Sequence, residues 1–182
     1  MVYTYYDCTN VEQLFIDDGE EPLELNYGEF KDCPLKYVYF GRKVSIDGYR
    51  YFPFYFCKEG IIEVSFGSNI TEIPDYISDF SNLETMILLN PTPPSVSSYC
   101  FNNSHYINLN VFVPKGSLET YLQADVWKNF WGLQERDFTG IEDVVTDGNR
   151  NNAAIYDMQG RRLNAPKTGL NIINGKKVMI RK

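Results

Sequence analysis

A short phrase recurs along the chain and limits the folds that it can adopt. In the first three copies an aromatic residue is followed, after two variable residues, by a cysteine, and two later pairs keep the spacing. The five pairs are Tyr5 with Cys8, Phe30 with Cys33, Phe54 with Cys57, Ile77 with Phe80, and Phe101 with Ser104. Their first members follow one another at steps of 25, 24, 23 and 24 residues. A fixed period of this size indicates a solenoid, in which each unit forms one coil.

Apolar residues follow each of the first four pairs in the order L-x-x-L-x-L. They are Val11, Leu14 and Ile16; Leu35, Val38 and Phe40; Ile61, Val64 and Phe66; and Leu83, Met86 and Leu88. The alternation in LKYVYF and LETMIL is typical of a short strand with one face turned inward. A second apolar set is expected to line the return side of each coil: Leu23, Leu25, Val44, Ile46, Ile70, Ile73 and Val96. Because one coil cannot bury its apolar face alone, the coils must share a core.

The segment SLETYLQADVWKNFWG is predicted to form a helix that closes the last coil. Ser117 is expected to cap its start, Glu119 to lie in its first turn and Gly132 to end it. The residues expected to cover the open end are Leu118, Tyr121, Leu122, Trp127 and Phe130. Trp127 and Trp131 are expected to pack in this cap, the alternative being a platform on which a sugar stacks. Without such a cap the last coil would expose apolar surface and a strand edge.

After this segment the chain becomes polar and rich in Asn, Asp and Gly, which predicts a linker over residues 136–152. Asn174-Gly175 lies between LNII and KKVMI, a strong signal for a two-residue hairpin, and Gln159-Gly160 predicts a second turn. We therefore predict a mainly β protein in three parts. Residues 1–135 form a leucine-rich-repeat solenoid of about five irregular coils of about 24 residues with a short helical cap. Residues 153–182 form a small β module.

The units resemble the BspA-type leucine-rich repeats of Bacteroidetes surface proteins. The resemblance covers residues 5–135 and includes the Thr92-Pro93-Pro94 turn and the closing sequence Val113-Pro114-Lys115-Gly116. The ending IYDMQGRRL…GLNIINGKKVMI resembles the C-terminal sorting-type tails of Bacteroidetes exported proteins. Together they imply a secreted or outer-membrane, cell-surface protein. The N-terminal residues lack the basic and apolar regions of a signal peptide, so we expect none in this chain, and we expect the chain to be part of a longer protein.

Composition narrows the classes of partner. The net charge of −7 and the isoelectric point near 4.8 argue against nucleic acid or an anionic membrane surface as partner. No apolar run reaches the roughly 18 residues of a membrane-spanning helix. Aromatic residues make up 15% of the chain, which favours strands over helices.

The chain offers little for catalysis or metal binding. Its one histidine, His105, lies at a repeat junction where a loop or packing role is expected, and no catalytic or phosphate-binding motif occurs. We therefore expect neither an enzyme nor a cofactor or metal site. Cys8, Cys33 and Cys57 recur once per coil, close enough for disulfides, but Phe80 takes the same position. We thus expect a buried apolar ladder of free thiols, with Cys100 buried elsewhere. The acidic DDGEEPLE sequence is expected to be a solvated turn rather than a calcium site.

The remaining candidate for function is the outward face of the strands. Variable residues on either side of each middle apolar position point out along one continuous face. They are Gln13, Phe15, Tyr37, Tyr39, Glu63, Ser65, Thr85 and Ile87. Four of the eight are large aromatic or aliphatic residues, and an exposed tyrosine offers both contact area and a hydroxyl. The alternative is that another segment covers this face, or that tyrosine here reflects strand propensity alone.

Three functions fit these patterns. The first is a non-enzymatic adhesion module that recognises a host extracellular-matrix protein, another cell or a glycan through the strand face. The second is a structural spacer whose tail serves secretion or surface anchoring. The third is a glycan-binding accessory part of a larger protein. The sequence leaves the ligand and the oligomeric state open.

Overall fold

The structure is a computed structural model of the whole chain. It describes Tyr5, residues 7–46 and 52–138 and, near the C-terminus, residues 155–156, 162–163, 167, 169–173 and 176–180. The chain divides into two compact units, Met1–Gly140 and Ile141–Lys182. Each unit is described by itself.

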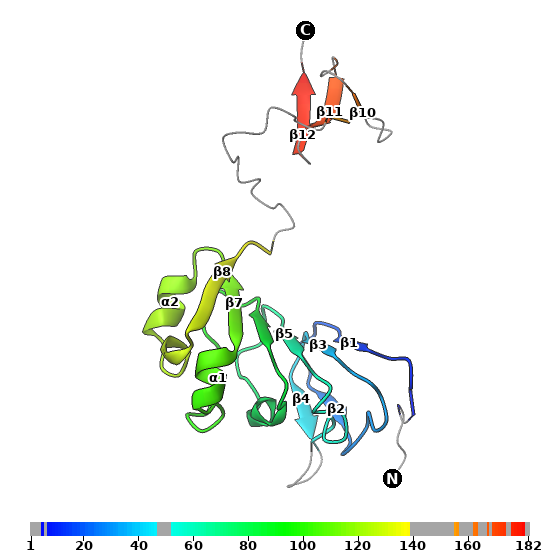
Figure 1. The fold of residues 1–182 in the computed structure, drawn as a ribbon, viewed down its shortest axis with the longest axis vertical. Helices are drawn as coiled ribbons and strands as arrows, with labels where there is room; N and C mark the ends of the chain where they lie inside the picture. The colour runs from blue at the N-terminus through cyan, green and yellow to red at the C-terminus, as the bar shows by residue number, and fades with distance from the viewer. Residues whose placement is uncertain are drawn as a thin grey trace. The chain divides into compact units, whose positions relative to one another are not determined.

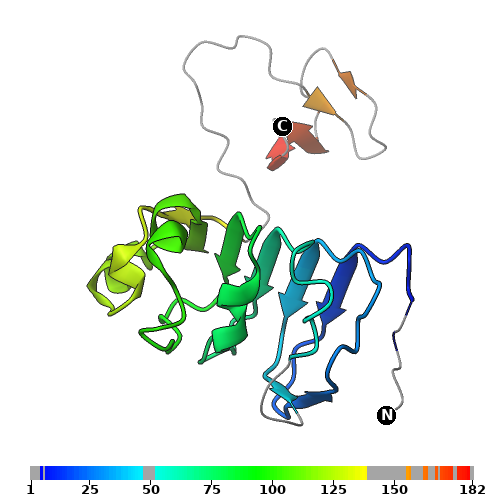
Figure 2. The same cartoon turned by 60° about the horizontal axis from the view of Figure 1, so that its bottom comes forward.

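A parallel sheet of six strands forms one side of the first unit. Its strands, in spatial order, are β1 (Gln13–Ile16), β3 (Tyr37–Phe40), β5 (Glu63–Phe66), β6 (Thr85–Leu88), β7 (Asn110–Pro114) and β8 (Gly132–Arg136). Figures 1 and 2 show these strands side by side. The first four lie where the L-x-x-L-x-L pattern predicts them, and the mainly β, leucine-rich-repeat fold is confirmed. Strands β7 and β8 extend the sheet beyond those four patterns.

The return side of the coils holds a shorter ladder. Strand β2 (Leu23–Leu25) pairs in parallel with β4 (Val44–Ile46), and Glu72 forms an isolated parallel bridge with Ser95. Leu25, Val44, Ile70 and Ile73 are buried and Leu23 and Val96 are partly buried against them, so these six members of the second apolar set face the core.

The recurring phrase builds a stack of side chains inside the solenoid. The rings of Phe30 and Phe54 stack at 5.1 Å, and Phe54 meets Phe80 edge to face at 6.0 Å. Cys33 and Cys57 are buried beside these rings. Cys8, Cys33, Cys57 and Cys100 are all free thiols in this structure, as a buried apolar ladder requires.

The closing segment differs from the single helix that we predicted. It forms α2 (Leu118–Gln123) and the 3₁₀ helix η2 (Trp127–Asn129), because Val126 adopts a positive φ of 70° between them. Ser117 does not cap α2 with its side chain; its hydroxyl donates to the Pro114 carbonyl at 2.6 Å. Gly132 does not end a helix but begins β8, where an added Cβ would lie 2.6 Å from the Leu109 carbonyl oxygen.

The two tryptophans of this segment have opposite environments. Trp127 is buried, as predicted, and its indole N–H donates to the Pro94 carbonyl at 2.8 Å. Tyr121 is buried too and donates its hydroxyl to the Asn90 carbonyl at 2.7 Å. The cap is thus attached to the NPTPP turn at both points. Trp131 is 80% exposed, so the prediction that it packs in the cap is wrong.

Two further short helices lie at the coil ends. The 3₁₀ helix η1 (Asp75–Asp79) places Ile77 in the core. Helix α1 (Asn103–Asn108) was not expected, and it contains His105. Asn102 caps this helix by accepting from the backbone N–H groups of Ser104 and His105, and its own N–H donates to Nδ1 of His105 at 3.2 Å. The histidine therefore has a structural partner, and burial lowers its pKa.

The second unit contains four antiparallel strands in the order β10 (Arg162–Leu163), β9 (Ile155–Tyr156), β11 (Gly169–Ile173) and β12 (Lys176–Ile180). Ile173 pairs with Lys176 at one end of the β11–β12 ladder. The predicted turn residues Gln159-Gly160 and Asn174-Gly175 lie outside the described residues.

Candidate functional site

The eight residues predicted for the strand face lie in two rows across β1, β3, β5 and β6. The cross-strand register aligns Gln13, Tyr37, Glu63 and Thr85 in one row and Phe15, Tyr39, Ser65 and Ile87 in the other. All eight are exposed or partly exposed, whereas the residues between and after them along each strand are mostly buried. The sheet therefore brings these side chains together on its outer face.

The largest exposed apolar group on this face is a stacked aromatic pair. The rings of Phe15 and Tyr39 lie 4.3 Å apart and within 7° of parallel, and Phe15 is 67% exposed. Tyr37, on the same strand as Tyr39, is also exposed. The three rings give the N-terminal half of the face exposed aromatic surface of the kind that protein interfaces use.

Asp18 holds the Tyr39 hydroxyl in place, and residues of the next two turns support this contact. The hydroxyl donates to Oδ1 of Asp18 at 2.9 Å, and burial, followed by this hydrogen bond, raises the pKa of Tyr39 to about 12. Arg42 donates to the carbonyls of Asp17 and Asp18 and so fixes the turn that carries the carboxylate. Gly67 leaves room for both groups, since a Cβ there would lie 2.8 Å from Asp18 Oδ1 and 2.9 Å from the Tyr39 hydroxyl oxygen.

Beyond Tyr39, the row that begins with Phe15 continues with two side chains that are not aromatic. Ser65, the next residue of this row, is small and lies between the larger Tyr39 and Ile87, and we call its position the notch. Strands in a sheet are about 4.8 Å apart, which places the two walls of the notch about 10 Å apart.

Four further residues extend the face. Asn110 on β7 continues the first row, and Phe112 on β7 and Gln134 on β8 continue the second. Arg136 pairs with Pro114 beyond the two rows, and its guanidinium lies 5.2 Å from the centre of the Phe112 ring. Sequence reasoning missed them, because NVFVP was taken as the start of the closing segment. Its own alternation was the signal that would have identified β7.

The described residues contain no group of three or more His, Cys, Asp or Glu side chains that could hold a metal ion. None of the helices among them is long and apolar enough to cross a membrane. Burial raises the pKa of the Cys57 and Cys100 thiols to about 12, so both are protonated at neutral pH. Protonated, buried thiols are poor nucleophiles.

Comparison with known families agrees with this geometry. The model of the BspA type leucine rich repeat region matches residues 2–124 in six copies. The chain belongs to this family. Repeats of this type are typical of surface-associated, protein-binding modules rather than enzymes. No curated protein and no solved structure matches the chain.

Proposed function

We propose that this BspA-type chain is a secreted or surface-exposed adhesion module that binds a protein through the strand face. The observation that carries the proposal is the stacked Phe15–Tyr39 pair on the sheet's outer face, in which Phe15 is 67% exposed and Tyr39 is partly exposed. Exposed aromatic residues held rigidly by their neighbours lose little conformational entropy on binding, and such residues often dominate binding energy.

The geometry of the face favours a protein over a glycan as partner. Repeats of this family are typical of protein-binding modules, and stacking leaves a sugar at most one face of each ring of the Phe15–Tyr39 pair. The notch over Ser65 instead offers a recess between Tyr39 and Ile87 that suits an inserted side chain. Among the host ligands that the sequence suggests, we therefore favour an extracellular-matrix protein.

A binding measurement with purified chain tests the proposal. Immobilised matrix glycoproteins and mucin-type glycans are probed with the wild type, with Phe15→Ala/Tyr39→Ala, and with Ser65→Arg, which fills the notch. We expect saturable binding to a matrix glycoprotein, weakened about 30-fold by either change, which corresponds to about 2 kcal/mol. Tyr99→Ala is the control, since Tyr99 is 94% exposed and lies off the strand face.

Each other outcome contradicts the proposal. Binding that survives both changes in folded protein would assign the contact to another surface. Preference for the glycans would favour the accessory glycan-binding function. Absence of binding across the panel would favour the structural spacer, in which the C-terminal unit serves secretion or anchoring.

A further inference from the structure

The return side of the solenoid contains a break that the strand side lacks. Leu23 donates its N–H to the Lys43 carbonyl, so the backbone groups of the next residue, Val44, face away from β2. Ser95 donates to Thr71 and Ile73 donates to Ser95, so the backbone groups of Glu72 face away from Ser95. Val44 and Glu72 therefore face each other, yet within the described residues no β-bridge joins the two segments.

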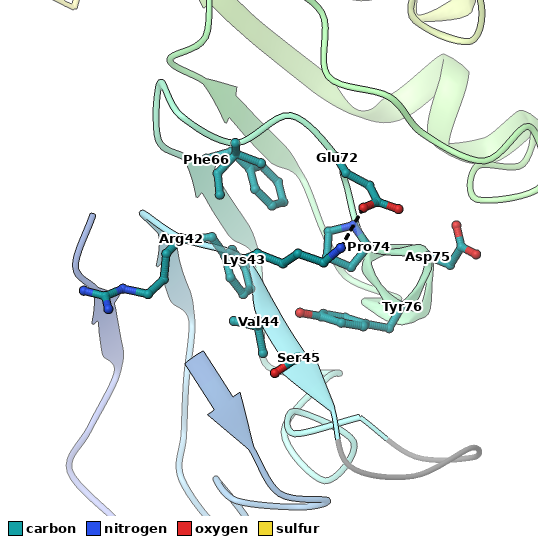
Figure 3. Close-up of a pocket in the computed structure, with 11 residues that line it drawn as sticks. Arg42, Lys43, Val44, Ser45, Phe66, Glu72, Pro74, Asp75 and Tyr76 are labelled. Carbon is teal, nitrogen blue, oxygen red and sulfur yellow. Dashed lines mark hydrogen bonds and ion pairs between the residues drawn. The ribbon is translucent and has the colours of Figure 1, made fainter. Parts of the chain in front are cut away.

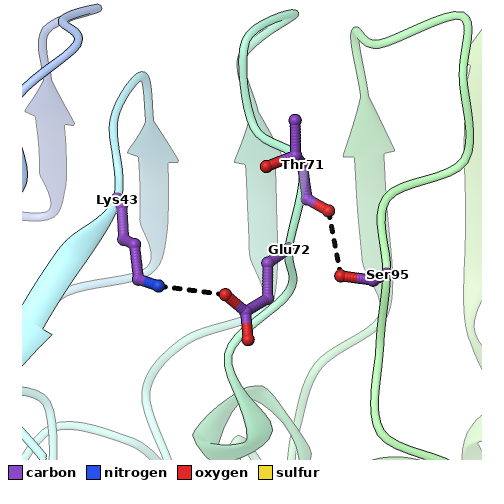
Figure 4. Close-up of polar contacts among 4 residues, drawn as sticks. All are labelled: Lys43, Thr71, Glu72 and Ser95. Carbon is purple, nitrogen blue, oxygen red and sulfur yellow. Dashed lines mark hydrogen bonds and ion pairs between the residues drawn. The ribbon is translucent and has the colours of Figure 1, made fainter.

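The break coincides with the longest coil. In the first row, Tyr37 and Glu63 are farther apart in sequence than any other two neighbours, so the coil between them is the longest. Its extra residues follow β4. Across the break, Nζ of Lys43 lies 3.0 Å from Oε2 of Glu72, as Figure 4 shows. Beyond Glu72, the backbone N–H of Ser95 donates to the Thr71 carbonyl at 2.8 Å, so the backbone ladder resumes one coil later. The Ser95 hydroxyl donates to the same carbonyl at 3.1 Å (Figure 4).

A pocket of about 350 Å³ occupies this break (Figure 3). More than half of its lining residues are aromatic or aliphatic: Phe40, Val44, Phe66, Ile70, Pro74 and Tyr76. Its volume is near the lower end of the range of roughly 300 to 1,000 Å³ that small-molecule sites occupy, and such sites are mainly apolar with a few polar groups. The pocket lies on the opposite side of the coils from the strand face and shares none of the residues proposed to bind the protein partner.

One polar group in the pocket wall has no partner. The Tyr76 hydroxyl is buried and makes no hydrogen bond, and it is the only buried side-chain polar atom of this kind within the described residues. Its ring stacks on Phe52 at 5.0 Å and within 6° of parallel, which fixes its orientation. In Figure 3 the hydroxyl points toward Val44 and Ser45 on the other wall. Burial raises the pKa of Tyr76, so the hydroxyl keeps its proton and remains a donor.

The charged groups near the pocket do not favour an ionic ligand. Lys43 and Glu72 neutralise each other, and Arg42 is bound to the carbonyls of the Asp17–Asp18 turn. Asp75 lies at the pocket as well, but it is exposed to solvent. The lining thus offers apolar surface and, among the described residues, one buried donor without a partner.

We propose that this pocket binds a small, uncharged, ring-bearing molecule whose oxygen accepts a hydrogen bond from the Tyr76 hydroxyl. The ring packs between Phe40, Phe66 and Val44, and its oxygen contacts Tyr76 directly. The site is separate from the strand face, so it adds a second binding function to the proposed adhesion module.

Titration of the ¹⁵N-labelled chain with two matched probes tests this site. Acetophenone carries a ring and a carbonyl oxygen, and ethylbenzene has nearly the same shape without the oxygen. We expect saturable shifts of the amides at 43–45, 71–73 and 75–76 with acetophenone, with a dissociation constant of about 10 mM or tighter. Ethylbenzene should bind about fivefold more weakly, which is the usual contribution of one hydrogen bond.

Three variants make the test specific. Tyr76→Phe should weaken acetophenone binding about fivefold and leave ethylbenzene binding unchanged, because it removes only the donor. Tyr99→Phe, which removes a hydroxyl from an exposed ring, should change neither. Ser45→Phe, in protein that gives a folded amide spectrum, should abolish binding of both probes by filling the pocket. Equal affinity of both probes in the wild type, shifts confined to other residues, or no saturable shift would overturn the proposal.

Discussion

At the scale of single residues, the environment of Cys57 shows how the core is packed. Cys57 is buried among the aromatic residues of the ladder, and its Sγ donates to the Phe54 carbonyl at 3.4 Å. Its pKa is raised to about 12, first by desolvation and then by the nearby Cys33. In the unfolded chain the thiol would lose its proton near pH 9. Between about pH 9 and 12 the folded chain therefore binds a proton at Cys57 that the unfolded chain has released.

This linkage predicts a loss of stability in alkali. The thiol's contribution is fully present below its unfolded pKa of about 9 and is lost as the pH rises toward 12. We expect the free energy of unfolding, measured with urea and reducing agent, to fall with pH across this window. The Cys57→Ser variant keeps the shape of the side chain but does not titrate in this pH window. Its free energy of unfolding should therefore fall less steeply with pH than that of the wild type. Identical slopes in the two proteins would contradict the assignment.

At the scale of elements, helix α1 depends on its cap more than on its packing. It has six residues, none of them fully buried, and Asn102 satisfies two of its free N–H groups. We expect Asn102→Ala to lower the free energy of unfolding by about 1 kcal/mol, the usual cost of losing an N-cap. Asn103→Ala, one residue later and exposed, should cost less than about 0.5 kcal/mol. Equal costs in urea titrations would show that the cap is not what stabilises the helix.

The elements also differ in how far the sequence could predict them. Strands β1, β3, β5 and β6 were predictable because each carries its own alternation, and the outward direction of Phe15 or Tyr39 follows from that period of two. Strand β8 could not be predicted in this way, because only Leu133 of GLQER turns inward. The strand is defined instead by its pairing with β7, which is distant in sequence. The break in the closing helix depends on the backbone of Val126, and no propensity rule predicts a positive φ for valine.

The same limit applies to the two sites. The sequence indicated which side chains share the strand face, but not that Asp18 binds the Tyr39 hydroxyl, since that contact joins turns from different coils. The return-side pocket was beyond prediction for a similar reason. It exists because two stacked coils fail to pair, and the position of one coil relative to the next is not encoded in either segment alone.

At the scale of the whole first unit, stability should depend strongly on its C-terminal cap. A solenoid is stabilised by contacts between neighbouring coils, so weakening one end should loosen the adjacent coils before the distant ones. Trp127 is the best single test, because it is fully buried, contacts the rings of Phe101 and Phe130, and binds the Pro94 carbonyl.

We expect Trp127→Phe to lower the free energy of unfolding by about 2–3 kcal/mol, through lost packing volume and an unpaired Pro94 carbonyl. Trp131→Phe, a matched change at an exposed ring, should cost less than about 0.5 kcal/mol. Amide hydrogen exchange should then accelerate in β6, β7 and β8 of Trp127→Phe while β1 and β3 keep their wild-type rates. Uniform acceleration over all six strands would mean that the sheet opens as one cooperative unit and that the cap has no local role.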